Sequence, residues 1–224
     1  MKLSKRLNAI AAMVEQNAVV ADVGCDHAQL CIALISSKKI QKAYACDVRI
    51  GPLSQAKKNI EYYNLEQYII PVLSDGMEKL EDDVTTVVIA GMGYETVQQI
   101  LDSHPEKLIY GRKFIIQVNK EVERLRKWIS DHRYLINKEC VIFEDGHYYQ
   151  IIAFQVKEDV SLNLDQLKFG KQMKKDDIFY SYWRHRWIKN EKIIKNLDRN
   201  HPKYYKIEQE MKQIYEELMK GSEG

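Results

Sequence analysis

Hydrophobic and polar positions follow two different patterns along the chain. Up to about residue 156, short apolar runs rich in β-branched and aromatic residues predict strands at 19–23, 43–47, 69–73, 84–89, 112–117, 134–143 and 148–156. Apolar residues at helical spacing predict helices between these strands, for example at 52–63 and 120–131. A further helix is expected over 4–16, with Ser4 as its N-cap. Strands that alternate with helices predict a mostly parallel sheet with right-handed crossovers.

The last two predicted strands are separated only by Glu144-Asp145-Gly146, a sequence typical of a tight turn. They are therefore expected to pair as an antiparallel hairpin. A mostly parallel sheet that ends in such a hairpin is an α/β, doubly wound, Rossmann-like architecture.

The strand pattern ends near residue 160. Beyond it, apolar residues recur at helical spacing, first Ile193 and Leu197 and later Ile207, Met211, Ile214 and Leu218, and His201-Pro202 separates the two series. The pattern predicts two long helices that pair as a coiled-coil-like hairpin. We therefore expect two domains, residues 1–158 for the sheet and residues 159–224 for the helices.

Composition changes this prediction in only one respect. The 224 residues are 45% hydrophobic and 29% charged with a net charge of +2, as in ordinary globular proteins. Residues 171–206, however, contain 11 Lys and Arg against 4 Asp and Glu, so the predicted helical region can attract phosphates. The four cysteines form no CxxC pair, and we expect no metal site. No leader and no membrane-spanning run is evident, which predicts a cytoplasmic protein.

Acidic residues and glycines gather where four of the predicted strands end. Ligands of open parallel sheets bind beyond the carboxyl ends of the strands, so these residues are predicted to form one site. The candidates are Asp22, Gly24, Cys25, Asp26 and His27 after the first strand, Asp47 and Val48 after the second, Asp75 and Gly76 after the third, and Ala90, Gly91, Met92 and Gly93 after the fourth.

The spacing of these candidates favours a nucleoside ligand. Asp47 follows Gly24 by 23 residues, the distance at which an acidic residue accepts from ribose hydroxyls in nucleotide-binding folds. Neither a GxGxxG motif nor a P-loop is present to hold a diphosphate. S-adenosylmethionine, a nucleoside with an amino-acid tail, fits both observations. A single strand-end Asp is often only a turn or helix cap, but four successive strand ends favour a binding site.

Several motifs resemble one family. "LSKRL" at 3–7, "ADVGCDHAQL" at 21–30, "ACDV" at 45–48, "SDGM" at 74–77 and "IAGMG" at 89–93 are similar to the bacterial tRNA adenine-22 N1-methyltransferases. The resemblance runs from about residue 3 to 157 and implies a class I methyltransferase that uses S-adenosylmethionine. Two departures stand out: Gln117-Val118-Asn119 replaces the family's Gln-Pro-Asn, and Gly93-Tyr94 replaces its Gly-Gly.

The reaction class suggests roles for two of the candidates. Methylation of adenine N1 needs the base unstacked into a pocket, and it leaves a positive ring that a carboxylate would stabilise. Asp26, directly after the glycine turn, is the candidate for this role, and His27 would orient it or bind cofactor. The alternative is that Asp26 only caps the following helix. Cys25 is interpreted as a small packing residue rather than a nucleophile.

The family resemblance and the charge distribution together predict a tRNA-binding role for the helical domain. Basic side chains neutralise phosphates, and interleaved aromatic rings can stack on exposed bases. The candidates for tRNA contact are Arg6, Gln117, Asn119, Arg184, Arg186, Lys189, Lys192 and Lys195. The alternative for the last five is an ordinary solvated helix face. We expect a monomer.

Two other functions fit parts of the sequence. One is a methyltransferase that acts on another RNA or a small molecule, although a small-molecule enzyme has no use for a basic helical domain. The other is a non-catalytic RNA-binding adaptor. The intact set of Asp22, Asp47 and Asp75 argues against an adaptor.

Overall fold

A computed structural model describes residues 3–220 of the chain. The chain divides into two compact units, one that ends at Met173 and one that begins at Lys174. The predicted catalytic region, residues 1–158, lies wholly within the first unit, and residues 159–173 belong to the same unit. Across residues 3–220, no helix combines the length and the apolar character needed to cross a membrane.

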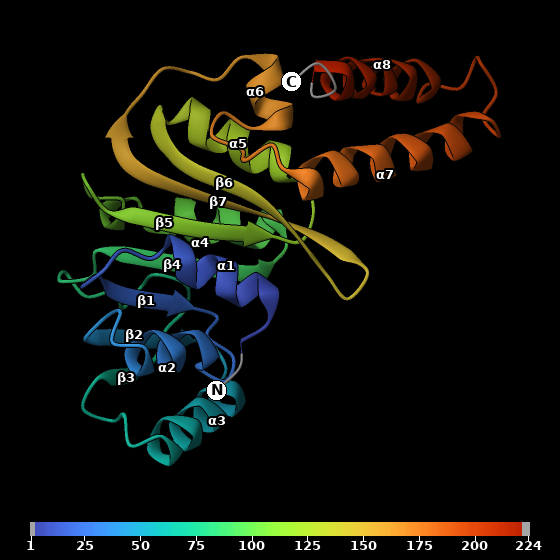
Figure 1. Cartoon of the computed structure of the whole chain (residues 1–224). Helices are drawn as coiled ribbons and strands as arrows, with labels where there is room; N and C mark the ends of the chain where they lie inside the picture. Colours follow the sequence, from blue (N-terminus) through green and yellow to red (C-terminus); the bar gives the residue numbers. More distant parts are fainter. Residues whose placement is uncertain (1–2, 221–224) are drawn as a thin grey trace. The chain divides into compact units, whose positions relative to one another are not determined.

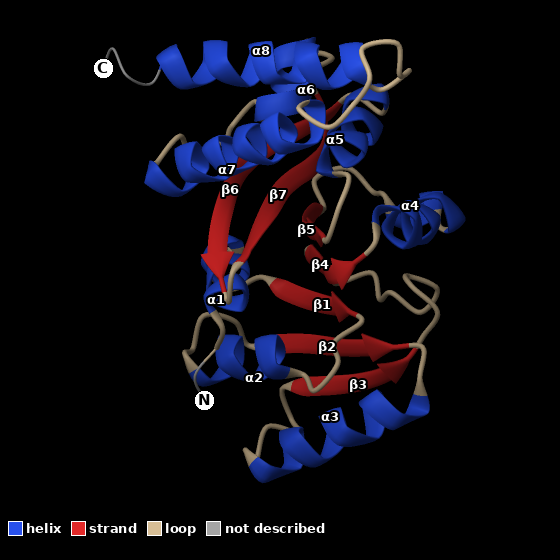
Figure 2. Ribbon diagram, turned by 90° about the vertical axis from the view of Figure 1, so that its right-hand side faces the viewer, coloured by secondary structure: helices blue, strands red, loops and turns tan. Residues whose placement is uncertain are grey.

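The first unit is built on one seven-stranded sheet with the strand order β3-β2-β1-β4-β5-β7-β6 (Figures 1 and 2). Neighbouring strands among β1 to β5 are parallel, and β7 pairs antiparallel with both β5 and β6. The predicted mostly parallel sheet with a terminal hairpin is therefore confirmed. The strands are β1 Val19–Val23, β2 Lys42–Asp47, β3 Ile69–Leu73, β4 Thr86–Met92, β5 Lys113–Val118, β6 Tyr134–Glu144 and β7 His147–Glu158.

Helices cover both faces of this sheet. Ser4 caps α1 as predicted, because its side chain accepts a hydrogen bond from the Leu7 N–H at 3.1 Å. This helix ends at Met13, three residues before the predicted end. The helices of the first unit are α1 Lys5–Met13, α2 Gln29–Ser36, α3 Ile50–Tyr62, α4 Tyr94–Ser103, α5 Val122–Asp131 and α6 Leu164–Phe169, with a short 3-10 turn at Pro105–Lys107.

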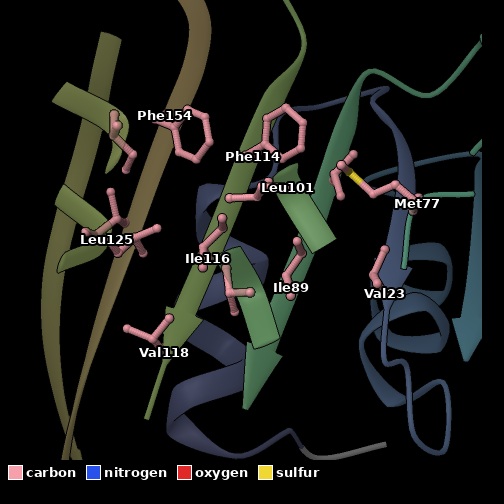
Figure 3. Close-up of a cluster of buried hydrophobic side chains, with 14 of the residues drawn as sticks. Val23, Met77, Ile89, Leu101, Phe114, Ile116, Val118, Leu125 and Phe154 are labelled. Carbon is pink, nitrogen blue, oxygen red and sulfur yellow. The ribbon is translucent and has the colours of Figure 1, made fainter. Parts of the chain in front are cut away.

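The alternation of side chains along each strand divides the core into two layers. On one face, Ile89 of β4 and Ile116 of β5 pack with α4 and α5 side chains, including Leu101 and Leu125 (Figure 3). On the other face, Val88 and its neighbours pack against α1, α2 and α3. Both faces of the central strands are buried, so the positions where these strands end are rigidly fixed.

Within the first unit, a buried ion pair joins the segment after β7 to α5 and the sheet. Arg126 of α5 donates from Nε to Glu139 Oε1 at 2.6 Å, and both side chains are fully buried. The same guanidinium donates to the Leu167 carbonyl oxygen, and Glu139 Oε2 accepts from the Gln172 N–H. Because a buried charge without its partner is costly, these bonds tie α6 and residues 170–173 to the sheet.

The second unit consists of α7 Asp177–Ile194 and α8 Tyr204–Lys220, which pack together. This confirms the two packed C-terminal helices that the sequence predicts. Asp176 caps α7 by accepting hydrogen bonds from the Ile178 and Phe179 N–H groups. An ion pair joins the helices, with Arg186 Nε 2.5 Å from Glu210 Oε1.

Candidate functional site

A cavity of about 840 Å³ opens at the carboxyl ends of β1, β2 and β4 and at the loop after β3. This is the edge of the sheet where parallel α/β folds bind ligands. Every predicted cofactor residue except Gly93, which instead occupies the N-cap position of α4, lines it. The predicted residues that line the cavity are Asp22, Gly24, Cys25, Asp26, His27, Asp47, Val48, Asp75, Gly76, Ala90, Gly91 and Met92.

Asp47, the last residue of β2, is buried and held in one orientation. Its Oδ1 accepts a hydrogen bond from the Arg49 N–H at 2.9 Å, and Arg49 Nε lies 3.7 Å from the same oxygen. No hydrogen bond to Oδ2 is described within residues 3–220. The carboxylate therefore has acceptor capacity left on the side of the cavity, as contact with the two hydroxyls of a ribose requires.

Asp22 lies buried in β1 at the base of the cavity. Its Oδ2 is 4.0 Å from the Cys31 thiol. Burial raises the pKa of the Asp22 carboxyl to about 7; Arg6 opposes this shift, and the carboxylates of Asp47 and Asp26 add to it. A cation bound in the cavity would favour the ionised form of this carboxyl.

Asp26 and His27 form the exposed side of the same turn. Their side chains are 67% and 44% exposed, and His27 Nε2 lies 3.6 Å from Asp26 Oδ1. Ala28, not Asp26, occupies the N-cap position of α2. Within residues 3–220, this helix end has no side-chain cap. Asp26 therefore does not cap α2, and its carboxylate remains available to a ligand at the mouth of the cavity.

Two glycines shape the floor of the cavity. At Gly24 the backbone has a φ of +76°, and a Cβ atom there would lie 2.2 Å from Met92 Cε. The positive φ is what favours glycine here, because Met92 Cε is the end of a flexible side chain that can move aside. Gly91, with a φ of +79°, forms a bulge in β4, and pairing with β5 resumes at Met92. This bulge explains why β4 ends at Met92 rather than at the predicted residue 89.

Arg6, Gln117 and Asn119, predicted to touch tRNA, form one hydrogen-bonded network beside the cavity. Gln117 Oε1 accepts from Arg6 Nη1 at 2.8 Å and from the Gly91 N–H at 3.1 Å, and Gln117 Nε2 donates to Asn119 Oδ1. Arg6 lines the cavity and Asn119 is exposed, whereas Gln117 is fully buried. In this structure Gln117 therefore holds Arg6 and the Gly91 bulge in place and has no surface to offer a tRNA.

One wall of the cavity was missed in the sequence analysis. The charged Arg49, from the loop after β2, also lines the cavity, but the missed wall consists of uncharged side chains of α4. The signal was available as an uncharged stripe at helical spacing directly after the predicted glycine-rich strand end. The residues are Thr96, Gln99, Ile100 and Ser103.

The cysteines near the cavity are not poised for nucleophilic chemistry. Burial raises the pKa of the Cys25 thiol well above its usual range, with Asp22 and Asp47 adding to the shift, and raises that of Cys46 to about 12. These thiols stay protonated and act as small packing groups. Within residues 3–220, no cluster of three or more His, Cys, Asp or Glu side chains could hold a metal ion.

The predicted basic residues of α7 fall into two groups. Arg184, Lys189 and Lys192 are exposed and form no ion pair within the described part of the chain. Arg186 pairs with Glu210 of α8, and Lys195 lies 3.1 Å from Glu191 one helical turn away. The first group is therefore free to meet an anion, whereas Arg186 holds the two helices together.

Comparison with known proteins agrees with this geometry. A family model described as a methyltransferase domain matches residues 3–152. The tRNA (adenine(22)-N(1))-methyltransferase of Bacillus subtilis is 32% identical over 154 residues, which cover 68% of this chain and 65% of that protein, slightly less than two thirds of its length.

Two solved structures share almost the whole fold. M. capricolum TrmK in complex with S-adenosyl-homocysteine is 33% identical with a TM-score of 0.87, and the match covers 97% of this chain and 98% of that one. Streptococcus pneumoniae Sp1610 in complex with S-adenosyl-L-methionine is 31% identical with a TM-score of 0.88, and the match covers 97% and 100%.

The sheet order, the strand-end cavity and the matching domain model define a class I methyltransferase fold. Within that class, the chain belongs to the bacterial tRNA (adenine-22 N1)-methyltransferase family, as its motifs predict.

Proposed function

We propose that this chain transfers the methyl group of S-adenosylmethionine to N1 of adenine 22 in tRNA. The observation that carries the proposal is the convergence of Asp22, Asp26 and Asp47 on one cavity, two of them buried and one exposed at its mouth. The names of the Bacillus subtilis relative and of M. capricolum TrmK support it, as does the S-adenosyl-L-methionine bound to the Streptococcus pneumoniae structure.

The residues of the cavity fit this cofactor. A volume of about 840 Å³ is within the usual range for ligand sites. Asp47 offers acceptors to the ribose hydroxyls, and the backbone of Gly24 and Gly91 allows close approach. Several carboxylates suit a ligand that carries a sulfonium and an ammonium, and Asp22 would accept from the ammonium.

When bound, S-adenosylmethionine supplies an electrophilic methyl group on a sulfonium. The protein's contribution is first to position the acceptor nitrogen in line with that methyl, which accounts for much of the rate gain in such transfers. Transfer would break the sulfonium–methyl bond as the N–C bond forms, so S-adenosylhomocysteine would leave as an uncharged thioether and the positive charge would pass to the adenine ring. Asp26, the exposed carboxylate at the cavity mouth, stabilises that charge, and His27 at 3.6 Å orients it.

The target nitrogen lies on the Watson–Crick edge, so the base must leave its stack before it can react. Arg6 lines the cavity and is fixed by Gln117, and the exposed Asn119 donates to the carbonyl oxygen of Gly91, a lining residue; both would contact the tRNA there. The exposed Arg184, Lys189 and Lys192 of α7 supply positive charge for more distant phosphates. Arg186 and Lys195, both held in ion pairs, contribute less. The predicted division into a catalytic region and a tRNA-binding helical region is kept in this proposal.

The reaction takes place in the cytoplasm and needs one copy of the chain. Every cofactor contact named above comes from residues of a single first unit. A monomer is therefore sufficient for the chemistry.

The test is methylation of an unmodified tRNA transcript, with nucleosides identified by mass spectrometry. We expect 1-methyladenosine from the parent tRNA and none when adenine 22 is replaced by guanine. Methylation elsewhere in that tRNA, or of another nucleoside, would mean that the chain is an RNA methyltransferase with a different target. A complete lack of product with several tRNAs, alongside normal cofactor binding, would contradict the proposal.

A further inference from the structure

The β6–β7 hairpin extends past the edge of the sheet at which the cavity opens (Figure 1). The last pair between β5 and β7 is Val118 with Gln150. The hairpin continues beyond that pair to Glu144 opposite His147. Its tip, residues 142–149, therefore projects beyond the carboxyl ends of the parallel strands.

Both faces of this tip carry aromatic rings. Phe143 and Tyr148 pair on one face, with ring centroids 4.6 Å apart. Alternate residues of a strand share a face, so His147 and Tyr149 lie together on the other side of β7, the side that Arg6 contacts. Their ring centroids are 6.5 Å apart in an edge-to-face arrangement, and His147 is exposed. Nothing in the mechanism above uses either ring.

Arg6 connects this face to the cavity. Its guanidinium Cζ lies 5.6 Å from the centre of the Tyr149 ring, and its Nη1 is bound to Gln117. Glu144, at the end of β6, accepts from the backbone N–H groups of Lys5 and Arg6 and so fixes the start of α1 against the hairpin. Arg6 thus has the cavity on one side and the aromatic face on the other, with donors beyond Nη1 still available.

We propose that the face formed by His147 and Tyr149 binds the nucleotide next to the target adenine, and that Arg6 contacts the phosphate between the two. This inference rests on the proposed function, because it takes an RNA substrate as given. A base that leaves its stack exposes the face of its neighbour, and aromatic side chains are the usual replacement. An arginine between a base pocket and a stacking surface lies where the joining phosphate must pass.

A purely structural role makes a different prediction. If Tyr149 serves only to hold Arg6, which itself contacts the tRNA in the proposed function, its loss would raise KM for tRNA without removing a stacking contact. If the face binds a nucleotide, its loss would raise KM for tRNA and leave that nucleotide unstacked, while the dissociation constant of the cofactor stays unchanged. The two roles are thus separable when KM and the stacking of that nucleotide are measured together.

The experiment compares Tyr149→Ala, Tyr149→Phe and His147→Ala with the parent chain. Tyr110→Ala is the matched control, because Tyr110 is a highly exposed tyrosine before the amino end of β5. We expect Tyr149→Ala to raise KM for tRNA about ten-fold, the order of one lost stacking contact. His147→Ala should raise KM a few-fold. Tyr149→Phe and Tyr110→Ala should match the parent, with cofactor affinity unchanged in all four variants.

A second measurement reports the contact directly. A tRNA that carries the fluorescent base 2-aminopurine next to position 22 should stay quenched on binding the parent chain, because the Tyr149 ring replaces the lost stacking neighbour, and should gain fluorescence on binding Tyr149→Ala. Equal fluorescence with the parent and with Tyr149→Ala would overturn the inference whether or not KM changes, as would a matching loss of cofactor affinity. If the parent methylates no tRNA, the proposed function itself fails. This outcome is distinct from the two results that would overturn only the role of the His147 and Tyr149 face.

Discussion

The strand-end cavity and the α7–α8 helices carry opposite charges, and they differ in whether the charged side chains are buried or exposed. In the cavity, the acidic Asp22 and Asp47 are buried and fixed by the strands that carry them. On α7, the basic Arg184 and Lys192 are exposed on flexible side chains. Buried carboxylates in fixed positions can orient a small cationic ligand, whereas exposed basic side chains attract a large polyanion at a distance. In the proposed function, the chemistry therefore belongs to the first unit and much of the affinity for tRNA to the second.

The sharpest way to break this contrast is to remove the second unit. A chain that ends at Met173 keeps the bonds of Arg126 and Glu139 to residues 167–172, whereas a chain that ends near residue 158 would leave that buried ion pair without part of its shell. The chain that ends at Met173 should fold, bind S-adenosylmethionine with unchanged affinity and lose tRNA methylation by about a thousand-fold, the scale expected when several phosphate contacts disappear. Calorimetry and a methylation assay measure the two quantities. Equal activity of this chain and the full-length chain would show that the helices do not serve tRNA.

Replacement of Asp26 by Asn tests the chemistry of the first unit alone. The change preserves size but removes the charge that would stabilise the methylated ring, so turnover should fall by about 100-fold or more. Cofactor affinity should change little, because Asp26 is largely exposed and caps no helix. His27→Ala is the companion variant and should have a smaller effect. Turnover within a few-fold of the parent in Asp26→Asn would leave the carboxylate without a catalytic role.

Asp47→Ala removes the contact assigned to the ribose. Loss of hydrogen bonds to a charged acceptor costs about 1–3 kcal/mol, which corresponds to roughly 5- to 150-fold weaker S-adenosylmethionine binding. Asp47→Asn retains the acceptor for the Arg49 N–H and controls for damage to the loop. The same dissociation constant for Asp47→Ala and the parent, by calorimetric titration, would remove Asp47 from the site.

The raised pKa of Asp22 predicts a pH dependence. Its carboxyl holds a proton in the folded protein up to about pH 7 but only to about 3.8 when unfolded, so without ligand the free energy of unfolding falls as pH rises from about 4 to 7. A cationic ligand needs the ionised form, so its affinity should rise by up to ten-fold per pH unit below 7 and level off above. Calorimetry from pH 5.5 to 8 measures this. Asp22→Asn should abolish the trend; a trend that persists there would point to another group.

Local pattern sufficed for much of the fold and for the cofactor residues, because strand ends are marked by abrupt changes from apolar to acidic or glycine residues. The prediction failed where pairing depends on distant residues. The end of β4 is set by the bulge at Gly91, after which Met92 pairs with Val118 of β5. The burial of Gln117 follows from Arg6, 111 residues earlier in the chain. The α4 residues that line the cavity were not predicted, because they are uncharged and the prediction relied on acidic and glycine residues at strand ends.

The smallest expected effect separates the two groups of basic residues on α7. Replacing Arg184, Lys189 and Lys192 with Gln should weaken tRNA binding and reduce the slope of log affinity against log salt by about 0.7 to 0.9 per lost phosphate contact. Arg186→Gln is the control at the ion-paired position: it removes one positive charge where the triple variant removes three, and it breaks the ion pair with Glu210, so it should lower thermal stability and change the slope by less than a third as much. Binding measured across a salt series, with a melting curve for each variant, distinguishes them. Parallel lines for the parent and the triple variant would mean that these three side chains meet no phosphate, and that α7 and α8 serve folding rather than tRNA.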